Sequence, residues 1–328
     1  MGNRTIVASA PHIHGHLSTT RLMGDVIIAL LPALAVAVYV YGWGVLGITA
    51  TSIGCCVLFE YLIQRFLVKG KQTITNLSAV VTGLLLAMNM PANIPLWIVA
   101  VGALVAIGVA KMPFGGLGKN PFNPAIVARV FLLIAYPVQM TSFAQPVSDG
   151  VDATSGATPL AAVGESLKNG LGLNYDTWDM FSGNIAGSLG EVATLALLLG
   201  GAYLLFRRVI TWHIPVSVLG TMAVFAAIYG ASTFGTVELA SSFTLFHLLA
   251  GGAVLGAVFM ATDYVTSPMT TKGAIVYAVG IGMITMFVRL WGAYPEGMSF
   301  AILIMNSVVP LIDKYMRPKR FGVVKSKK

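Results

Sequence analysis

The sequence has 328 residues, of which 56% are hydrophobic and only 10% charged, and its mean hydropathy is +0.82. Soluble globular chains carry about 25% charged residues, so this composition excludes an ordinary soluble domain and indicates that a lipid bilayer is the solvent. The net charge of +8 does not indicate a nucleic-acid partner, because the basic residues stand mostly singly between apolar runs, except in a tail from 317 to 328.

Ten apolar runs recur along the chain, and each approaches the roughly 20 residues needed to cross about 30 Å of hydrocarbon. They lie at 25–42, 46–66, 74–90, 95–110, 124–142, 188–206, 213–230, 243–262, 273–291 and 298–316. We therefore predict an all-α integral membrane protein with ten transmembrane helices. Cys55 and Cys56 are adjacent within the second run and show no CxxC or metal-ligand spacing, so we interpret them as buried packing thiols.

The loop charges predict the orientation of these helices. When the loops are assigned alternately to two sides, one side receives 18 of the 20 Lys and Arg residues, Arg129 among them. The other side receives Lys168, Arg289 and eight of the 12 acidic residues, including Glu296. Because short cytoplasmic loops hold an excess of Lys and Arg, both termini are predicted to be cytoplasmic.

The longest polar stretch divides the chain into three parts. We predict a first five-helix half at 1–142, an extracytoplasmic loop at 143–187 and a second five-helix half at 188–328. Since five is odd, the second half begins on the opposite face of the membrane, so any repeat is inverted.

Two pairs of short runs echo each other between the halves. AVVTGLLLAMNMP at 79–91 echoes AVLGAVFMATDYV at 253–265, and GKNPFNP at 118–124 echoes GAYPEGM at 292–298. Chance similarity between apolar strings explains these echoes about as well as a repeat. Each pair nevertheless places Gly, Pro and polar residues at matching helix ends, where broken helices line binding sites in membrane proteins.

The polar loop contains the run Asp-Ala-Thr-Ser-Gly-Ala-Thr at 152–158. It fits the pattern D-x-S/T-S/T-G-A-T, at which a flavin transferase esterifies threonine with the phosphate of FMN. For the last four residues alone, a surface turn rich in Ser, Thr and Gly is the better interpretation. The full pattern, in the loop that the charges place outside the cytoplasm, favours flavin attachment.

With this motif the chain resembles the family that contains the D subunit of the Rnf complex and the B subunit of the sodium-pumping NADH:quinone reductase. Essentially the whole chain takes part, and the absence of a longer N-terminal extension favours the Rnf branch. Tyr264 departs from the family pattern, in which proline follows the aspartate, and this leaves the helix break after Asp263 uncertain. The other runs that carry the resemblance are APHIHGHLSTTRLM at 10–23, GGLGKNPFNPA at 115–125, FMATDYVTSP at 259–268 and RLWGAYPEGMSFAILIMN at 289–306.

The resemblance implies that the phosphate of FMN is joined covalently to Thr158. Asp152, Ser155, Gly156 and Ala157 are then attachment determinants, the small residues leaving room for the transferase. The resemblance also allows a non-covalent riboflavin in the membrane core. The loop with Gly115, Gly116, Gly118, Asn120, Asn123 and Pro124 could approach such a ligand, although tight helix packing explains its glycines nearly as well.

The implied function is that of a membrane subunit in an ion-translocating oxidoreductase complex, relaying electrons between partner subunits with transport of Na⁺ or H⁺. The implied partners are a second flavin-bearing subunit, iron–sulfur subunits, the flavin transferase and membrane lipid, in a bacterial or archaeal cytoplasmic (inner) membrane. The chain shows no Cys-rich iron–sulfur pattern, GxGxxG fingerprint or P-loop, so it is not predicted to be an autonomous enzyme. The alternative is a channel or transporter of small solutes, a role that inverted five-helix repeats also serve.

Four carboxylates lie near the cytoplasmic ends of the predicted spans: Asp25, Glu60, Asp263 and Asp313. A carboxylate in a membrane is costly unless it is paired, hydrated or functional. Glu60 and Asp263 are therefore candidates for an ion path. For Glu60 the alternative is a salt bridge with Arg65 or Lys69.

Overall fold

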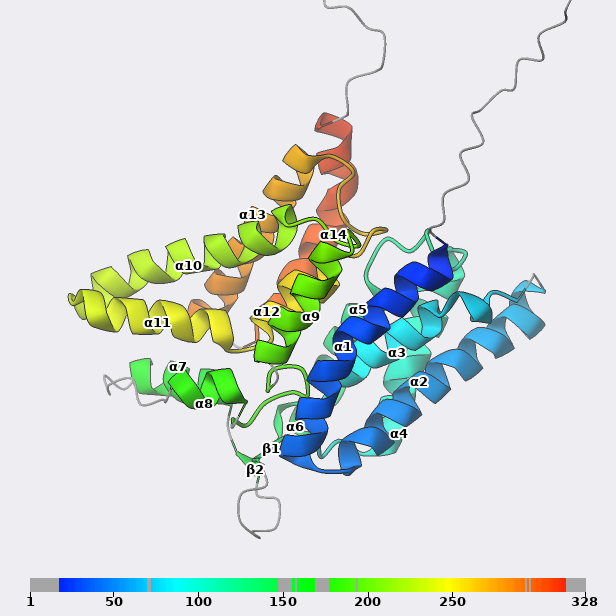
Figure 1. The fold of residues 1–328 in the computed structure, drawn as a ribbon, viewed down its shortest axis with the longest axis horizontal. Helices are drawn as coiled ribbons and strands as arrows, with labels where there is room; N and C mark the ends of the chain where they lie inside the picture. The colour runs from blue at the N-terminus through cyan, green and yellow to red at the C-terminus, as the bar shows by residue number, and fades with distance from the viewer. Residues whose placement is uncertain are drawn as a thin grey trace, which may run out of the picture.

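The structure, a computed structural model, describes residues 18–69, 72–146, 155–156, 158–168, 177–183, 185–192, 194–292, 294 and 296–316 (Figure 1). Within these ranges it is almost entirely helical. Its helices and strands are α1 (Thr19–Tyr41), α2 (Gly44–Leu62), η1 (Ile63–Val68), η2 (Ile74–Asn76), α3 (Ser78–Met88), α4 (Leu96–Leu104), η3 (Val105–Val109), η4 (Met112–Phe114), α5 (Pro124–Ala135), α6 (Pro137–Thr141), β1 (Phe143–Ala144), β2 (Ser155–Gly156), α7 (Pro159–Lys168), α8 (Thr177–Ser182), α9 (Thr194–Phe206), α10 (His213–Phe234), α11 (Val237–Leu249), α12 (Ala253–Leu255), η5 (Gly256–Met260), α13 (Thr271–Trp291) and α14 (Met298–Tyr315).

Six helices in the described ranges are long and apolar enough to cross a membrane. They are Thr19–Tyr41, Gly44–Val68, Leu96–Phe114, His213–Phe234, Thr271–Trp291 and Met298–Tyr315. A seventh span is formed if α11 and the segment Ala253–Met260 count as one helix, but the two are bent by 58°. The chain is thus a multi-pass, all-helical membrane protein.

The remaining predicted runs contain helices that are too short to span a bilayer by themselves. These are α3 with 11 residues, α5 with 12 and α9 with 13. At 1.5 Å per residue, an 11-residue helix is about 16 Å long, roughly half the hydrocarbon thickness. The structure therefore does not confirm ten full-length spans, although each of the ten runs contains helix.

Side-chain caps mark the starts of several helices. Ser18 accepts a hydrogen bond from the amide of Arg21 at the start of α1, and Thr270 accepts one from Gly273 at the start of α13. At the start of α5, Asn123 accepts a hydrogen bond from Ala125, and Pro124 occupies the first helical position. Each of these oxygens satisfies an amide that has no partner within its helix.

Two of the apolar runs are interrupted by residues with left-handed backbone. Leu77, with φ 62°, precedes α3, and Gly252, with φ 61°, precedes α12. At the second break, Gly251 also has a positive φ of 65°. A helix cannot continue through such a conformation, so each run becomes a half-helix that starts within the apolar sequence.

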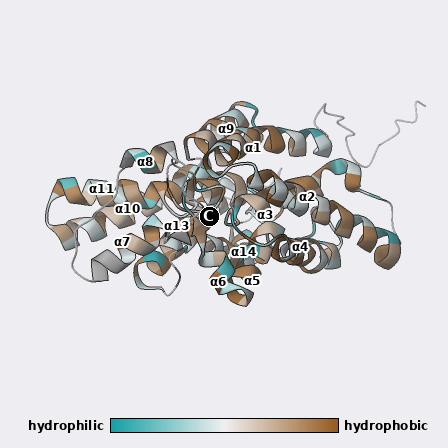
Figure 2. Cartoon of the chain, turned by 90° about the horizontal axis from the view of Figure 1, so that it is seen from below, coloured by the Kyte–Doolittle hydropathy of each residue, from teal (hydrophilic) through white to brown (hydrophobic). Residues whose placement is uncertain are grey.

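The helices of the two halves pack in corresponding ways. α2 packs against α3 and α4, and α10 packs against α11 and α13, while α1 packs on α9 and α5 on α14 across the interface. α1 begins at the same upper edge of the molecule at which α14 ends (Figure 1). Hydrophobic residues, drawn in brown, occur along most of these helices (Figure 2). Many large hydrophobic side chains are exposed, as expected for a chain surrounded by lipid.

The described residues of the predicted polar loop form several small elements. β1 and β2 form an antiparallel pair in which Phe143 faces Gly156, and α7 and α8 lie beneath α11 (Figure 1). A small core, separate from the main one, joins them to the end of α11 and to the turn before α9. It consists of Leu160, Val163, Met180, Ile185, Val192, Phe246, Leu249 and Ala250.

Candidate functional site

Thr158, the predicted attachment residue, lies directly before α7. Its carbonyl oxygen accepts a hydrogen bond from the amide of Ala162 at 3.0 Å, so it occupies the N-cap position of this helix. Ser155 and Gly156 form strand β2, while Asp152 and Ala157 lie outside the described residues. The N-terminus of a ten-residue helix carries unpaired amides and a partial positive charge, which suit a phosphate group.

The side chain of Thr158 is buried, with an exposed fraction of only 4%. Two residues later, Leu160 packs into the small core against the end of α11. The predicted attachment therefore requires that the threonine oxygen first becomes accessible to the transferase.

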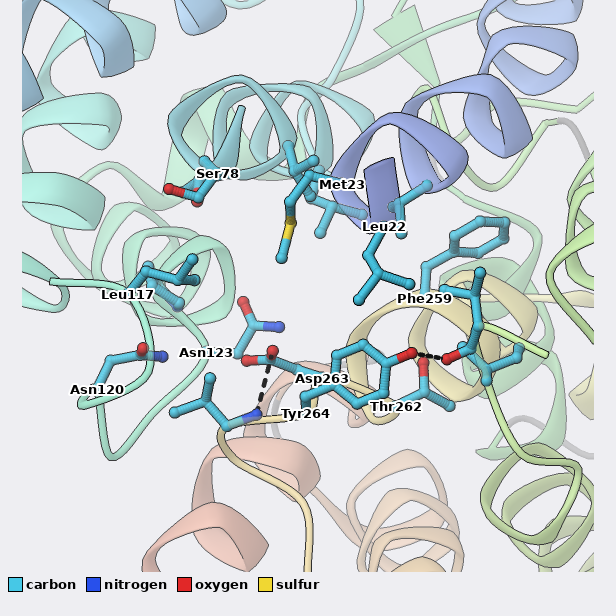
Figure 3. Close-up of a pocket in the computed structure, with 18 of the residues that line it drawn as sticks. Leu22, Met23, Ser78, Leu117, Asn120, Asn123, Phe259, Thr262, Asp263 and Tyr264 are labelled. Atoms are coloured by element: carbon cyan, nitrogen blue, oxygen red, sulfur yellow. Dashed lines mark hydrogen bonds between the residues drawn. The ribbon is translucent and has the colours of Figure 1, made fainter. Parts of the chain in front are cut away.

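A large cavity opens on the opposite side of the molecule, near the start of α1. Its empty space is about 800 Å³, including the open mouth. Figure 3 shows Leu22 and Met23 of α1 on one side of this cavity and Asp263 and Tyr264 on the other. Most of the lining is apolar. Polar side chains also line the cavity: Ser78, Thr82, Lys111, Asn120, Asn123, Thr262 and Asp263.

The glycine-rich loop before α5 forms part of the cavity wall. Gly115, Gly116 and Gly118 all have positive φ, and Leu117, Asn120 and Asn123 line the cavity. Asn120 donates to the carbonyl of Phe122, and Asn123 donates to the carbonyl of Met260 at the end of η5. The loop is thereby held between α5 and the broken helix.

Glu60 is 1% exposed, and its partner is Lys111 rather than Arg65 or Lys69. The ammonium of Lys111 lies 2.6 Å from Oε2 of Glu60 and donates to Oγ of Ser78 at 2.7 Å. Gln64 donates to the other carboxylate oxygen of Glu60 at 3.3 Å. The alternative of a salt bridge with Arg65 or Lys69 was therefore wrong, because the partner of Glu60 is Lys111. This pair is buried beside the start of α3 rather than placed at the membrane interface.

Asp263 follows the half-helix that ends at Met260 and lines the large cavity. Its carboxylate accepts hydrogen bonds from the amide of Val265 at 3.5 Å and from the hydroxyl of Thr266 at 3.3 Å. Lys111 acts on it electrostatically, so both candidate carboxylates, Glu60 and Asp263, lie within the field of one lysine. The sequence analysis missed Lys111, although a lone lysine at the end of an apolar run is itself a signal of an intramembrane pair.

Arg129 and Glu296 were assigned to opposite sides of the membrane by the charge sorting, and this assignment is wrong. They form a buried ion pair between Nη2 of Arg129 on α5 and Oε2 of Glu296 before α14. Arg129 lies in the middle of a short helix that starts within the protein, so alternate assignment of loops cannot place it.

Comparisons with known proteins cover nearly the whole chain. The model of the NQR2, RnfD, RnfE family matches residues 6–322. The D subunit of the Na⁺-translocating ferredoxin:NAD⁺ oxidoreductase complex of Acetobacterium woodii is 47% identical over 326 residues, covering 98% of this chain and 96% of the relative. The D subunit of the proton-translocating complex of Clostridium ljungdahlii is 42% identical over 324 residues, 96% of each chain. The D subunit of the ion-translocating oxidoreductase complex of Erwinia tasmaniensis is 37% identical over 359 residues, covering 98% and 99%.

Proposed function

Because the chain belongs to the NQR2, RnfD, RnfE family, we propose that it is the D subunit of an ion-translocating ferredoxin:NAD⁺ oxidoreductase complex. The observation that carries this proposal is its end-to-end similarity to relatives of that name, at 47% and 42% identity. These two relatives are named for different ions, so similarity does not choose between Na⁺ and H⁺. Partners in this function are the other subunits of the complex, including a second flavin-bearing subunit and iron–sulfur subunits.

The proposal includes FMN joined through its phosphate to Thr158. The described residues fit such a group, because Thr158 caps the N-terminus of α7, where an anion is stabilised. A flavin bound there would supply one-electron chemistry, for which the protein provides position and surroundings. The chain's own contribution is the small core around Leu160, which holds the start of α7 against α11.

The large cavity is proposed to hold a non-covalent flavin. Its apolar walls suit a planar aromatic ring, and Asn120, Asn123 and Asp263 supply donors and acceptors that could orient the ring edge. In this proposal Lys111 sets the charge beside that ring, and Glu60 fixes the position of the lysine. Glu60 and Asp263 stay our candidates for an ion path on this side.

The finer topology is also a proposal: ten membrane-embedded segments in two inverted halves, with both termini cytoplasmic. It is supported by the corresponding packing of α2 with α4 and of α10 with α13, and by a left-handed residue before the third segment of each half. In this arrangement Thr158 lies on the extracytoplasmic side and the large cavity on the cytoplasmic side.

Expression of the chain together with its flavin transferase tests the attachment. The denatured wild-type chain should fluoresce in a gel, and its intact mass should exceed that of the polypeptide by FMN minus water. Thr158→Ala should be dark, while Thr141→Ala, which removes another hydroxyl of the same region, should fluoresce like the wild type. A dark wild-type chain would reject covalent flavin and leave a transporter as the better interpretation.

A further inference from the structure

A second, smaller cavity lies close to the large cavity, since Phe259 lines the large cavity and the next residue, Met260, lines the smaller one. Its empty space is about 260 Å³ including its open side, with room inside for about one water molecule, and we call it the inner chamber. Gly252, at the start of the second half-helix, and Asn89, at the end of α3, both line it. The chamber therefore lies between the end of α3 and the start of the half-helix Ala253–Met260.

Four charged side chains gather around the inner chamber. Three of them line it: Arg129, Glu191 and Glu296. The fourth, Arg289, donates hydrogen bonds to the carbonyls at the helix break, those of His247, Ala250 and Gly251. Glu191 interacts electrostatically with both arginines. All four residues are less than 10% exposed.

Two polar atoms in the wall of the inner chamber have no hydrogen-bond partner among the described residues. They are Nη1 of Arg129, a donor, and Oε1 of Glu296, an acceptor. Leaving a buried charged group partly without hydrogen bonds is costly, so native proteins rarely do it. An occupant that both donates and accepts hydrogen bonds removes this cost for both atoms.

The charges around the chamber decide whether a cation, an anion or a neutral molecule can occupy it. Two guanidinium groups offset two carboxylates, so a metal cation would leave an uncompensated positive charge in a low-dielectric site. An anion would leave the opposite imbalance. We propose that the inner chamber is a permanently hydrated site, in which ordered water bridges Arg129 and Glu296 at the start of the second half-helix.

Hydration also explains how the second half-helix starts at this depth. The first amides of the segment Ala253–Met260 lack partners within their helix. The last carbonyls of α3, in contrast, accept hydrogen bonds from Asn89, Met90 and Gly190. Inside a membrane protein, non-helical backbone is tolerated where it lines a water-filled space. The chamber has the polar partners that an ordered water requires, in contrast to an apolar cavity, which stays dry.

Radiolytic hydroxyl-radical footprinting of the wild-type chain in nanodiscs tests this proposal, because radicals formed from bound water oxidise nearby buried methionines. Met260 and Met298 line the chamber, although they are only 2% and 4% exposed. Met222 and Met286 are fully buried away from it and serve as dry controls, and the exposed Met269 is the positive reference. We expect Met260 and Met298 to be oxidised on the order of tenfold faster than the dry controls.

A paired variant, Arg129→Leu with Glu296→Leu, is expected to lower the oxidation of Met260 and Met298 to the level of Met222. Both charges are removed together because a single change would leave the other buried and unpaired. Wild-type rates at Met260 and Met298 equal to those at Met222 would overturn the proposal, whether or not the paired variant folds. Oxidation that rises only when Na⁺ is replaced by choline would overturn it too, since the occupant would then be a metal cation.

Discussion

The ammonium of Lys111 and the carboxylate of Glu60 lie 2.6 Å apart, and both side chains are at least 97% buried. This pair joins the segment after α4 to the end of α2, next to the first residue of α3. It thereby fixes the start of a half-helix that borders the large cavity.

Glu60→Gln should destabilise the chain, because it leaves the ammonium of Lys111 buried without its counter-charge. Breaking a buried pair by removal of one partner costs about 3–5 kcal/mol. Thermal unfolding in detergent, followed by tryptophan fluorescence, measures the loss. Glu60→Gln combined with Lys111→Met should recover most of it, and the exposed Lys119→Met should unfold like the wild type. Equal stability of Glu60→Gln and the wild type would mean that the pair is not buried.

Gly200→Ala should force α1 and α9 apart. A Cβ atom at this position would lie 2.1 Å from the carbonyl oxygen of Ala29, and backbone atoms cannot yield as a side chain can. We expect a loss of roughly 1–3 kcal/mol, the usual cost of overpacking. Gly220→Ala in α10 has no atom within 4 Å and should instead gain up to about 1 kcal/mol from helix propensity. Thermal unfolding of the two variants in parallel checks this, and similar behaviour of both would contradict the close packing.

Asp25→Asn should loosen the contact between α1 and α9 near the mouth of the large cavity. The carboxylate of Asp25 accepts hydrogen bonds from Tyr203 at 3.0 Å and from Arg207 at 3.2 Å. Because the Arg207 side chain is 34% exposed, solvent screens the pair, and we expect a loss of about 1 kcal/mol. Raising the ionic strength should reduce the difference between the variant and the wild type. A difference that does not depend on salt would indicate a packing effect rather than an electrostatic one.

Leu160→Ala should speed the attachment of flavin, on the proposal that Thr158 carries it. The threonine is 4% exposed, and truncation of Leu160 weakens the core that holds α7 against α11. A weakening of about 1.4 kcal/mol raises the open population tenfold. The measurement is the initial rate at which purified bare chain gains flavin fluorescence when incubated with the transferase. Leu199→Ala, on the lipid-facing side of α9, is the control, and unchanged rates would show that opening of α7 does not limit the reaction.

Much of the architecture could be predicted from the sequence, because each apolar run contains helix and the charge pattern marks the loops. The interruptions could not be located in the same way. Hydropathy is averaged over a window of about 19 residues, and the break at Ala250–Gly252 is only three residues long. The echo between 79–91 and 253–265 nevertheless pointed to the two segments that the structure shows as half-helices.

The partners of the buried charged residues could not be predicted from the sequence. Glu60 meets Lys111, 51 positions away, and Arg129 meets Glu296 from the other half. Such partners are selected by how the helices pack, whereas the sequence suggested only neighbours one or two turns along, Arg65 and Lys69. The roles of the whole attachment motif stay predictions: Asp152 and Ala157 lie outside the described residues, and the described positions of Ser155, Gly156 and Thr158 do not test them.

The short length of α3 has an electrical consequence. Its first residue, Ser78, borders the large cavity, and the residue after its end, Asn89, borders the inner chamber. The large cavity also borders α3 as far as Leu85, four residues before Asn89, so the two spaces are separated by only about 6 Å along the helix axis. On the proposed topology, with both spaces hydrated, the membrane voltage would fall over this short distance, and the electric field there would be stronger than in the surrounding lipid.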